Sequence, residues 1–132
     1  MKLIEEINLD NGLKLNIFDL SRPIAADTVK VEIAIQTKID LKESYFSDRR
    51  DYHQVKNIFG DKLAYEHKIE RAFVSKDTQD AVRQELVNAF KINSLNYIAA
   101  KKFPLKLALA MLKEIKNNPY KYQGRPDSSF EE

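Results

Sequence analysis

The clearest pattern in the chain is an alternation of apolar and polar side chains over residues 29–41. Odd positions of this stretch are apolar except at Thr37, and polar side chains fill most even positions. Period two over thirteen residues predicts a β-strand with one buried face and one face in water. Burial is expected for Val31, Ile33 and Ile35, and exposure for Lys30, Glu32 and Gln36.

Two shorter alternating stretches precede this strand. Residues 3–9 and 13–17 carry apolar side chains at most of their odd positions. Between them, Asp10-Asn11-Gly12 supplies residues that tolerate a positive φ, so the sequence predicts a β-hairpin. Residues 19–28 follow as a predicted loop, because Pro23 lacks the N–H that a strand ladder requires.

The rest of the chain is mainly helical in its periodicity. Apolar side chains at helical spacing predict helices after Ser47, after Thr78 and at Pro104. The first of these is expected to end at Gly60, a residue type common at helix C-termini. Residues 63–74 return to period two and predict a fourth strand between the first two helices.

This order of elements predicts an α+β fold. A mostly antiparallel four-stranded sheet is expected, made of the β-hairpin, the third strand, a short helix and the fourth strand, with the two C-terminal helices packed on one face. A chain of 132 residues is long enough for one continuous core, so residues 1–119 are predicted to form a single domain. Residues 120–132 show no periodicity and are predicted to form a flexible C-terminal tail.

Composition limits the classes of function. The chain has no cysteine, which excludes disulfides, thiolate zinc sites and cysteine nucleophiles. No apolar run approaches the ~20 residues of a membrane span, and the N-terminal residues lack a signal-peptide core. The three glycines are isolated, so glycine-rich nucleotide sites are excluded. We therefore expect a cytoplasmic protein that binds no cofactor and no membrane.

Neither histidine has the neighbours of a metal or acid–base site. His67 falls on the predicted apolar face of the fourth strand, whereas Glu66 and Glu70 point to the opposite face. His53 is fourteen positions away from His67 and has no carboxylate at a suitable offset. No metal site and no catalytic residue are expected.

The loop from Asp19 to Asp27 is the most unusual local segment. The forked guanidinium of Arg22 can bind a carboxylate or a phosphate. The preferred interpretation is structural: an aspartate pairs with Arg22, and Ser21 bonds the local backbone. The alternative is a small enzyme or a ligand- or anion-binding site formed by Arg22, Asp19, Asp27 and Arg71.

Basic residues are concentrated near the C-terminus. Residues 101–125 hold seven Lys and Arg against a single Glu. This charge can follow a phosphate backbone, with tyrosines available for stacking, but it is also typical of a solvated helix. The candidate nucleic-acid-binding residues are Lys102, Lys106, Lys113, Lys116 and Lys121.

Several short motifs between residues 10 and 75 resemble a known group of proteins. They are Asn11-Gly12-Leu13, Asp19-x-Ser21-Arg22 followed by Asp27, Tyr65-Glu66, and Glu70-Arg71-x-Phe73. Together they are similar to a group of small uncharacterised bacterial proteins with no assigned activity. The resemblance implies a bacterial origin, and it carries no functional residue over to this chain.

These observations favour a non-enzymatic protein-interaction or accessory domain. The expected partner is another protein or a second copy of the chain, because small sheets leave edges that a homodimer can pair. Nucleic-acid binding through the basic C-terminal helix and tail is the alternative, and it is not favoured. An enzyme built on the Asp19–Asp27 loop is the third hypothesis.

Overall fold

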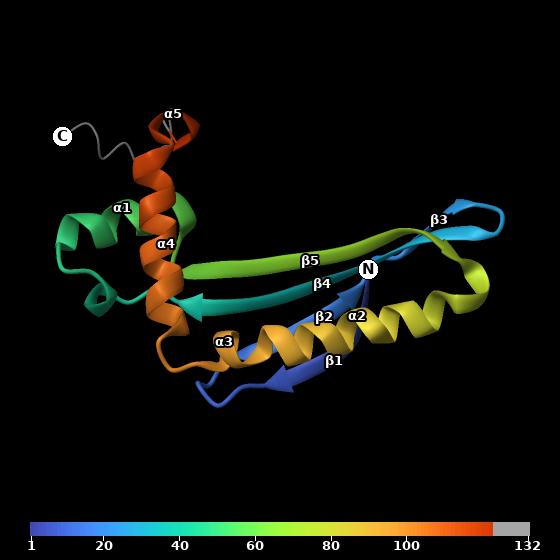
Figure 1. The fold of residues 1–132 in the computed structure, drawn as a ribbon. Helices are drawn as coiled ribbons and strands as arrows, with labels where there is room; N and C mark the ends of the chain where they lie inside the picture. Colours follow the sequence, from blue (N-terminus) through green and yellow to red (C-terminus); the bar gives the residue numbers. More distant parts are fainter. Residues whose placement is uncertain (123–132) are drawn as a thin grey trace. The chain divides into compact units, whose positions relative to one another are not determined.

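The computed structural model describes residues 1–122, and residues 123–132 of the predicted tail lie outside the described part (Figure 1). The chain forms two compact units, each made of two separate stretches of sequence. Unit 1 contains Met1–Thr37 and Tyr65–Lys101, and unit 2 contains Lys38–Ala64 and the chain from Lys102 onward. The single domain predicted over residues 1–119 thus contains two compact units.

A mostly antiparallel sheet and several helices confirm the predicted α+β class. β2 and β3 pair one after the other with the same edge of β4, since Asp19 is opposite Ile33 and Arg22 is opposite Lys30 in one continuous register. β1 pairs with β2, and β5 pairs with the other edge of β4. The strands are β1 (Lys2–Asn8), β2 (Lys14–Asp19), β3 (Arg22–Ala25), β4 (Thr28–Asp40) and β5 (Lys62–Ser75).

The strand β3 corrects the prediction of a loop over residues 19–28. Pro23 lies opposite Val29 in the β3–β4 register, and the register shifts before Ala25. Proline is tolerated here because β3 pairs with β4 on one side only, so the missing N–H interrupts no second ladder. The sheet therefore has five strands rather than four.

The predicted hairpin between β1 and β2 is confirmed. Gly12 has a φ of 89°, and the Leu9 amide donates to the Leu13 carbonyl at 2.8 Å. The Asn11 side-chain amide donates to the carbonyl oxygens of Ile98 and Ala100, at 2.8 and 2.9 Å. These long-range bonds hold the hairpin tip against the chain that follows helix α2.

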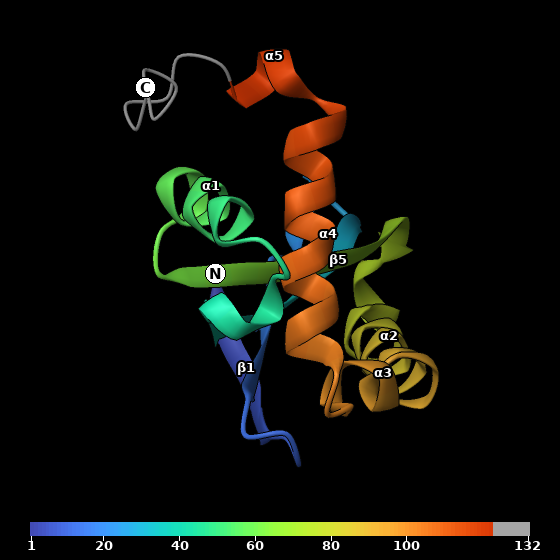
Figure 2. The ribbon, with the colours of Figure 1, turned by 90° about the vertical axis from the view of Figure 1, so that its left-hand side faces the viewer.

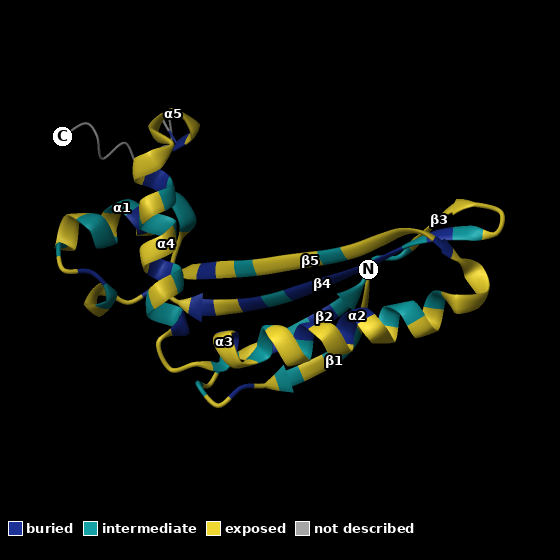
Figure 3. Ribbon diagram, in the orientation of Figure 1, coloured by how far each residue is buried: buried dark blue, intermediate teal, exposed yellow. Residues whose placement is uncertain are grey.

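The core of unit 1 lies between the odd face of β4 and helix α2. Leu15 and Ile17 from β2 are fully buried together with the odd-numbered residues of β4, and α2 contributes Phe90. Figure 3 shows the contrast between the buried positions of β4 and the exposed positions of β5. The helical segments of unit 1 are η2 (Lys76–Thr78, a 3₁₀-helix), α2 (Gln79–Asn93) and α3 (Leu95–Ala99).

The predicted facing of β4 is correct except at Glu32. Val31, Ile33 and Ile35 are buried as expected, and Lys30 and Gln36 are not buried, each with intermediate exposure. Glu32 was expected in water and is buried, with 7% of its surface exposed, because β3 places the Arg22 side chain beside it.

Unit 2 is built on the contact between α1 and α4, which lie side by side in Figure 2. Helix α1 begins after Asp48, whose side chain accepts the Arg50 amide, and ends at Gly60, which has a φ of 91°. Val55, Phe103 and related apolar side chains are buried in this unit. Its helices are η1 (Glu43–Tyr45), α1 (Arg49–Phe59), α4 (Phe103–Asn117) and α5 (Pro119–Tyr122).

Two features of the C-terminal region differ from the prediction. Helix α4 belongs to unit 2 and packs against α1, whereas α2 belongs to unit 1, so the two C-terminal helices do not pack within one unit. Residues 120–122 of the predicted tail are helical, and the ring of Tyr122 lies 5.7 Å from that of Phe59, centroid to centroid.

Replacing Ile33 with alanine tests the importance of the β4 face. Ile33 is fully buried, so Ile33→Ala is expected to lower the free energy of unfolding by roughly 2–5 kcal/mol. Ile92→Ala is the matched control: Ile92 is 78% exposed, and its loss should change stability by less than about 0.5 kcal/mol. Urea unfolding followed by circular dichroism measures the free energy of unfolding of both variants. If the two substitutions lowered it by equally small amounts, the assignment of the buried face of β4 would be wrong.

Candidate functional site

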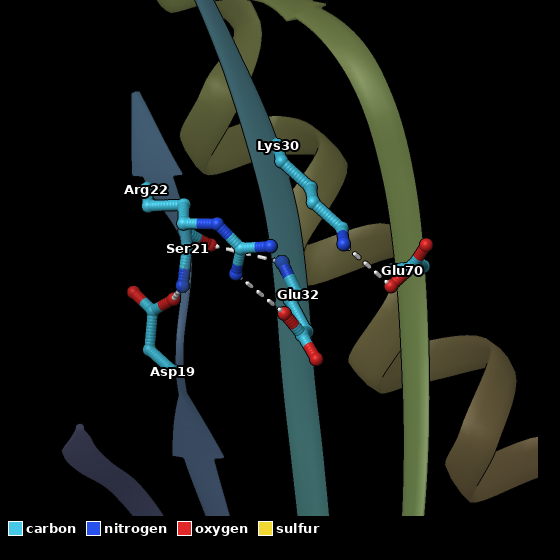
Figure 4. Close-up of polar contacts among 6 residues, drawn as sticks. All are labelled: Asp19, Ser21, Arg22, Lys30, Glu32 and Glu70. Atoms are coloured by element: carbon cyan, nitrogen blue, oxygen red, sulfur yellow. Dashed lines mark hydrogen bonds and ion pairs between the residues drawn. The ribbon is translucent and has the colours of Figure 1, made fainter. Parts of the chain in front are cut away.

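Side-chain contacts hold the Asp19–Asp27 segment against β4 (Figure 4). The Arg22 Nη1 atom lies 3.1 Å from the Glu32 Oε1 atom. The Glu32 backbone amide donates to the Ser21 hydroxyl oxygen at 3.1 Å. Arg22 and Ser21 therefore hold the start of β3 on β4, as the structural interpretation of this segment predicts, although the acid that pairs with Arg22 is Glu32 rather than an aspartate.

The charges continue from this pair across the even face of β4 to β5. Lys30 Nζ lies 2.9 Å from Glu70 Oε1, and the Gln36 side-chain amide donates to Glu66 at 2.6 Å. Lys30 precedes Gln36 along β4, whereas the partner of Lys30 follows the partner of Gln36 along β5. The two strands are therefore antiparallel. Each cation drawn in Figure 4 has a carboxylate beside it, which leaves little net positive charge to attract an anion.

Asp19 makes a separate set of contacts. Its Oδ1 atom accepts the Ser21 amide at 2.8 Å, and its Oδ2 atom lies 3.3 Å from Arg83 Nη1 on α2. Burial raises the pKa of the Asp19 carboxyl, but the Ser21 hydrogen bonds and the Arg83 charge outweigh it and hold that pKa below its ordinary value. Asp19 thus stays ionised and ties β2 to α2.

The other two predicted site residues lie in different surroundings. The Asp27 side chain is exposed, and its backbone carbonyl accepts the Lys76 amide at 2.9 Å. Arg71 Nη1 lies 3.0 Å from Glu85 Oε1 at the surface. Asp19 and Arg22 are connected through Ser21, which lies between them and contacts both Asp19 and β4. Each of the four predicted site residues nevertheless contacts a different partner.

Two depressions in unit 1 lie away from these four residues. One of about 350 Å³ is lined by Asp10, Asn11, Ala99 and Lys101, beside the hairpin tip. The other, of about 580 Å³, runs along the exposed side of α2 between Ala81 and Ile92. Neither depression collects the charged groups expected of a catalytic centre.

The predicted nucleic-acid-binding lysines lie in unit 2. Lys116 is 3.3 Å from Asp51, and Lys121 is 3.1 Å from Glu114. The described residues of unit 2 hold eleven Lys and Arg against six Asp and Glu, a net charge of +5. Lys102, Lys106 and Lys113 complete the set, and nucleic-acid binding stays a prediction.

Both histidines, His53 and His67, are exposed. Within residues 1–122, no three His, Asp or Glu side chains are grouped as metal ligands would be. The same part of the chain contains no helix long and apolar enough to cross a membrane.

The sequence analysis expected a partner at a sheet edge, and one open edge is the outer edge of β5, defined here as the edge that faces away from β4. Among residues 1–122, β5 pairs with β4 and with no other strand. Ten of its fourteen residues are exposed, so the strand is accessible over most of its length. The signal available in the sequence was the charge on both sides of this strand, which is common on sheet edges.

The backbone and exposure of Phe73 are features that the sequence analysis missed. It has a φ of 57°, a conformation that is rare for a bulky residue, and 80% of its surface is exposed. Before it, the odd-numbered Ile69 is half-buried; after it, the even-numbered Val74 is buried. The left-handed backbone at Phe73 therefore reverses the facing of β5, turning Val74 inward and leaving the phenyl ring in solvent.

Comparisons with family models, curated proteins and solved structures found no match to this chain. The resemblance to small bacterial proteins therefore remains a prediction.

The lowered pKa of Asp19 predicts a pH-dependent contribution to stability. At neutral pH, Asp19→Asn is expected to lower the free energy of unfolding by roughly 1–2 kcal/mol, since it removes a charge-assisted contact. The folded-state pKa lies below the unfolded one, so this contribution is present above pH ~4–5 and is lost as the pH falls through the folded pKa.

Chemical unfolding of Asp19→Asn and wild type between pH 2 and 7 measures the difference. Asp27→Asn, at an exposed side chain, is the matched control and should unfold like wild type at neutral pH. A difference for Asp19→Asn that stays constant down to the lowest pH would contradict the assignment.

Substitution of Phe73 tests the cost of its left-handed backbone. Glycine removes a steric penalty of roughly 1–2 kcal/mol but adds unfolded-state entropy worth ~0.5–1 kcal/mol. Phe73→Gly is therefore expected to be as stable as wild type or up to about 1 kcal/mol more stable. Phe73→Ala keeps the Cβ atom and should be less stable than Phe73→Gly. A higher melting temperature for Phe73→Ala than for Phe73→Gly would contradict the backbone strain at this position.

Proposed function

We propose that this protein is a non-enzymatic interaction module that binds an extended segment of a partner polypeptide along the outer edge of β5. The observation that supports it is a fourteen-residue strand that pairs with one neighbour within the described chain and is exposed over most of its length. Such an edge presents backbone N–H and C=O groups at the spacing that an added strand requires.

The two edges of the sheet are not equivalent. The other edge is formed by β1, which has seven residues and a register shift between Leu3 and Glu5, and by the four-residue β3, which contains Pro23. A shift of this kind disrupts the regular order of hydrogen-bonding groups and protects an edge from pairing. β5 is twice as long as β1, and its left-handed residue Phe73 lies near its C-terminal end, so no positive φ interrupts residues 65–72.

Phe73 adds a second reason to choose β5. An exposed aromatic side chain is unfavourable in water, and its backbone conformation costs further free energy. Aromatic residues are frequent among the side chains that dominate binding energy at protein interfaces. We therefore assign Phe73 as the anchor of the partner segment.

The charged residues of the Asp19–Asp27 segment support binding rather than catalysis. Arg22, Asp19 and Arg71 each form an ion pair with a residue outside the predicted site. Their placement accounts for the attachment of β3 and α2 to the rest of unit 1. It supplies no group poised to act on a substrate.

Site-specific cross-linking in cells tests the proposed function. A photoreactive amino acid at position 68, on β5, is expected to cross-link to a partner, and one at position 113, on α4, is the control. The adduct is identified by mass spectrometry, and the partner is purified and titrated with the wild-type protein. The β5 amides should become protected from hydrogen exchange in that complex.

The same titration with variants assigns the contact. Phe73→Gly is expected to weaken binding at least about tenfold, as loss of an anchor does. Ile92→Ala removes another exposed apolar side chain, outside β5, and should bind like wild type. Equal cross-linking at both positions, or unchanged affinity of Phe73→Gly, would contradict the proposal.

A further inference from the structure

Resting on this proposed function, we infer that the partner segment is β5 of a second copy of the chain, paired antiparallel about a two-fold axis through Ile69. In such a pair, a residue that precedes Ile69 on one strand lies opposite the residue that follows Ile69 by the same number of positions on the other strand. A symmetric homodimer of this kind joins two sheets into one and leaves neither β5 edge exposed.

Charge complementarity is compatible with this register, although an axis at His67 would also form two opposite-charge pairs, between Glu66 and Lys68. With the axis at Ile69, Lys68 of each copy lies opposite Glu70 of the other, which gives two opposite-charge pairs on one face. Glu70 also contacts Lys30 through one carboxylate oxygen, so its second oxygen can accept from Lys68. An axis at Lys68 would instead place Glu66 opposite Glu70 and Lys68 opposite itself.

The aromatic residues agree with the same register. Tyr65 is four positions before Ile69 and Phe73 is four positions after it, so Phe73 of each copy comes close to Tyr65 of the other, at the two ends where the regular stretch of β5 stops. Cross-strand aromatic pairs stabilise antiparallel sheets. Phe73 loses its exposure in this arrangement, and the half-buried Tyr65 gains a further contact.

The remaining cross-strand pairs are compatible with the register. Glu66 lies opposite Ala72, and Ile69 lies opposite itself. His67 lies opposite Arg71, whose charge is already engaged by Glu85 at 3.0 Å. One strand pair makes a small interface, so we expect a dimer that dissociates on dilution.

Cysteine scanning tests the register directly, because the natural chain contains no cysteine. Only a residue on the axis faces its own copy at the Cα separation of a disulfide. Ile69→Cys is expected to form a disulfide-linked dimer on mild oxidation, at least tenfold faster than His67→Cys or Arg71→Cys. A maximum at a different position would overturn the register.

Charge reversal provides a second measurement that does not depend on oxidation. Lys68→Glu and Glu70→Lys should each weaken homodimerisation about tenfold, because each places like charges opposite one another. Mixed together, the two variants restore both opposite-charge pairs and should form the heterodimer, which native mass spectrometry resolves. Lys113→Glu on α4 makes the same charge change outside β5 and should dimerise like wild type, and circular dichroism checks that each variant is folded.

Sedimentation velocity separates failure of this inference from failure of the proposed function. A mass that stays at 15.3 kDa at the highest concentration, with no disulfide at position 69, would overturn self-pairing. Specific cross-linking of position 68 to a different protein would then leave the interaction function standing. If the chain stayed monomeric and position 68 cross-linked to no other protein, the proposed function would be contradicted as well.

Discussion

The central strand β4 is the constraint on which the sheet depends. β2 and β3 occupy one of its edges in a single register, and β5 occupies the other. Its odd face supplies the largest continuous set of buried side chains of any strand, including Ile33 and Ile35. Because both edges of β4 are used, open edges remain on β1, β5 and the four-residue β3 among the described strands.

Ion pairs organise the elements around this strand. Arg22 pairs with Glu32, Lys30 with Glu70, and Arg83 with Asp19, so the predicted anion-binding region of the Asp19–Asp27 segment is neutralised by its own neighbours. Such exposed and half-buried pairs add modest stability, but they fix which strand lies beside which.

Local periodicity was sufficient to predict the elements but not their tertiary partners. The alternation of β4, the hairpin at Gly12 and the stop of α1 at Gly60 are local signals, and all three are confirmed. The burial of Glu32 depends on β3, and β3 could not be inferred because proline argues against a strand until its one-sided pairing is known. Likewise, the division of α2 and α4 between two units depends on contacts far apart in sequence, and the left-handed backbone at Phe73 has no composition signal.

The central claim is that the outer edge of β5 pairs with the same edge of a second copy of the chain. Amide hydrogen exchange, resolved by NMR for single residues and recorded at low and high protein concentration, tests it most directly. Every second amide between residues 65 and 73 points away from β4 and should exchange more slowly at high concentration, while the amides of β1 keep their rates. Unchanged exchange throughout β5, with slowing confined to β1 or to unit 2, would contradict the account.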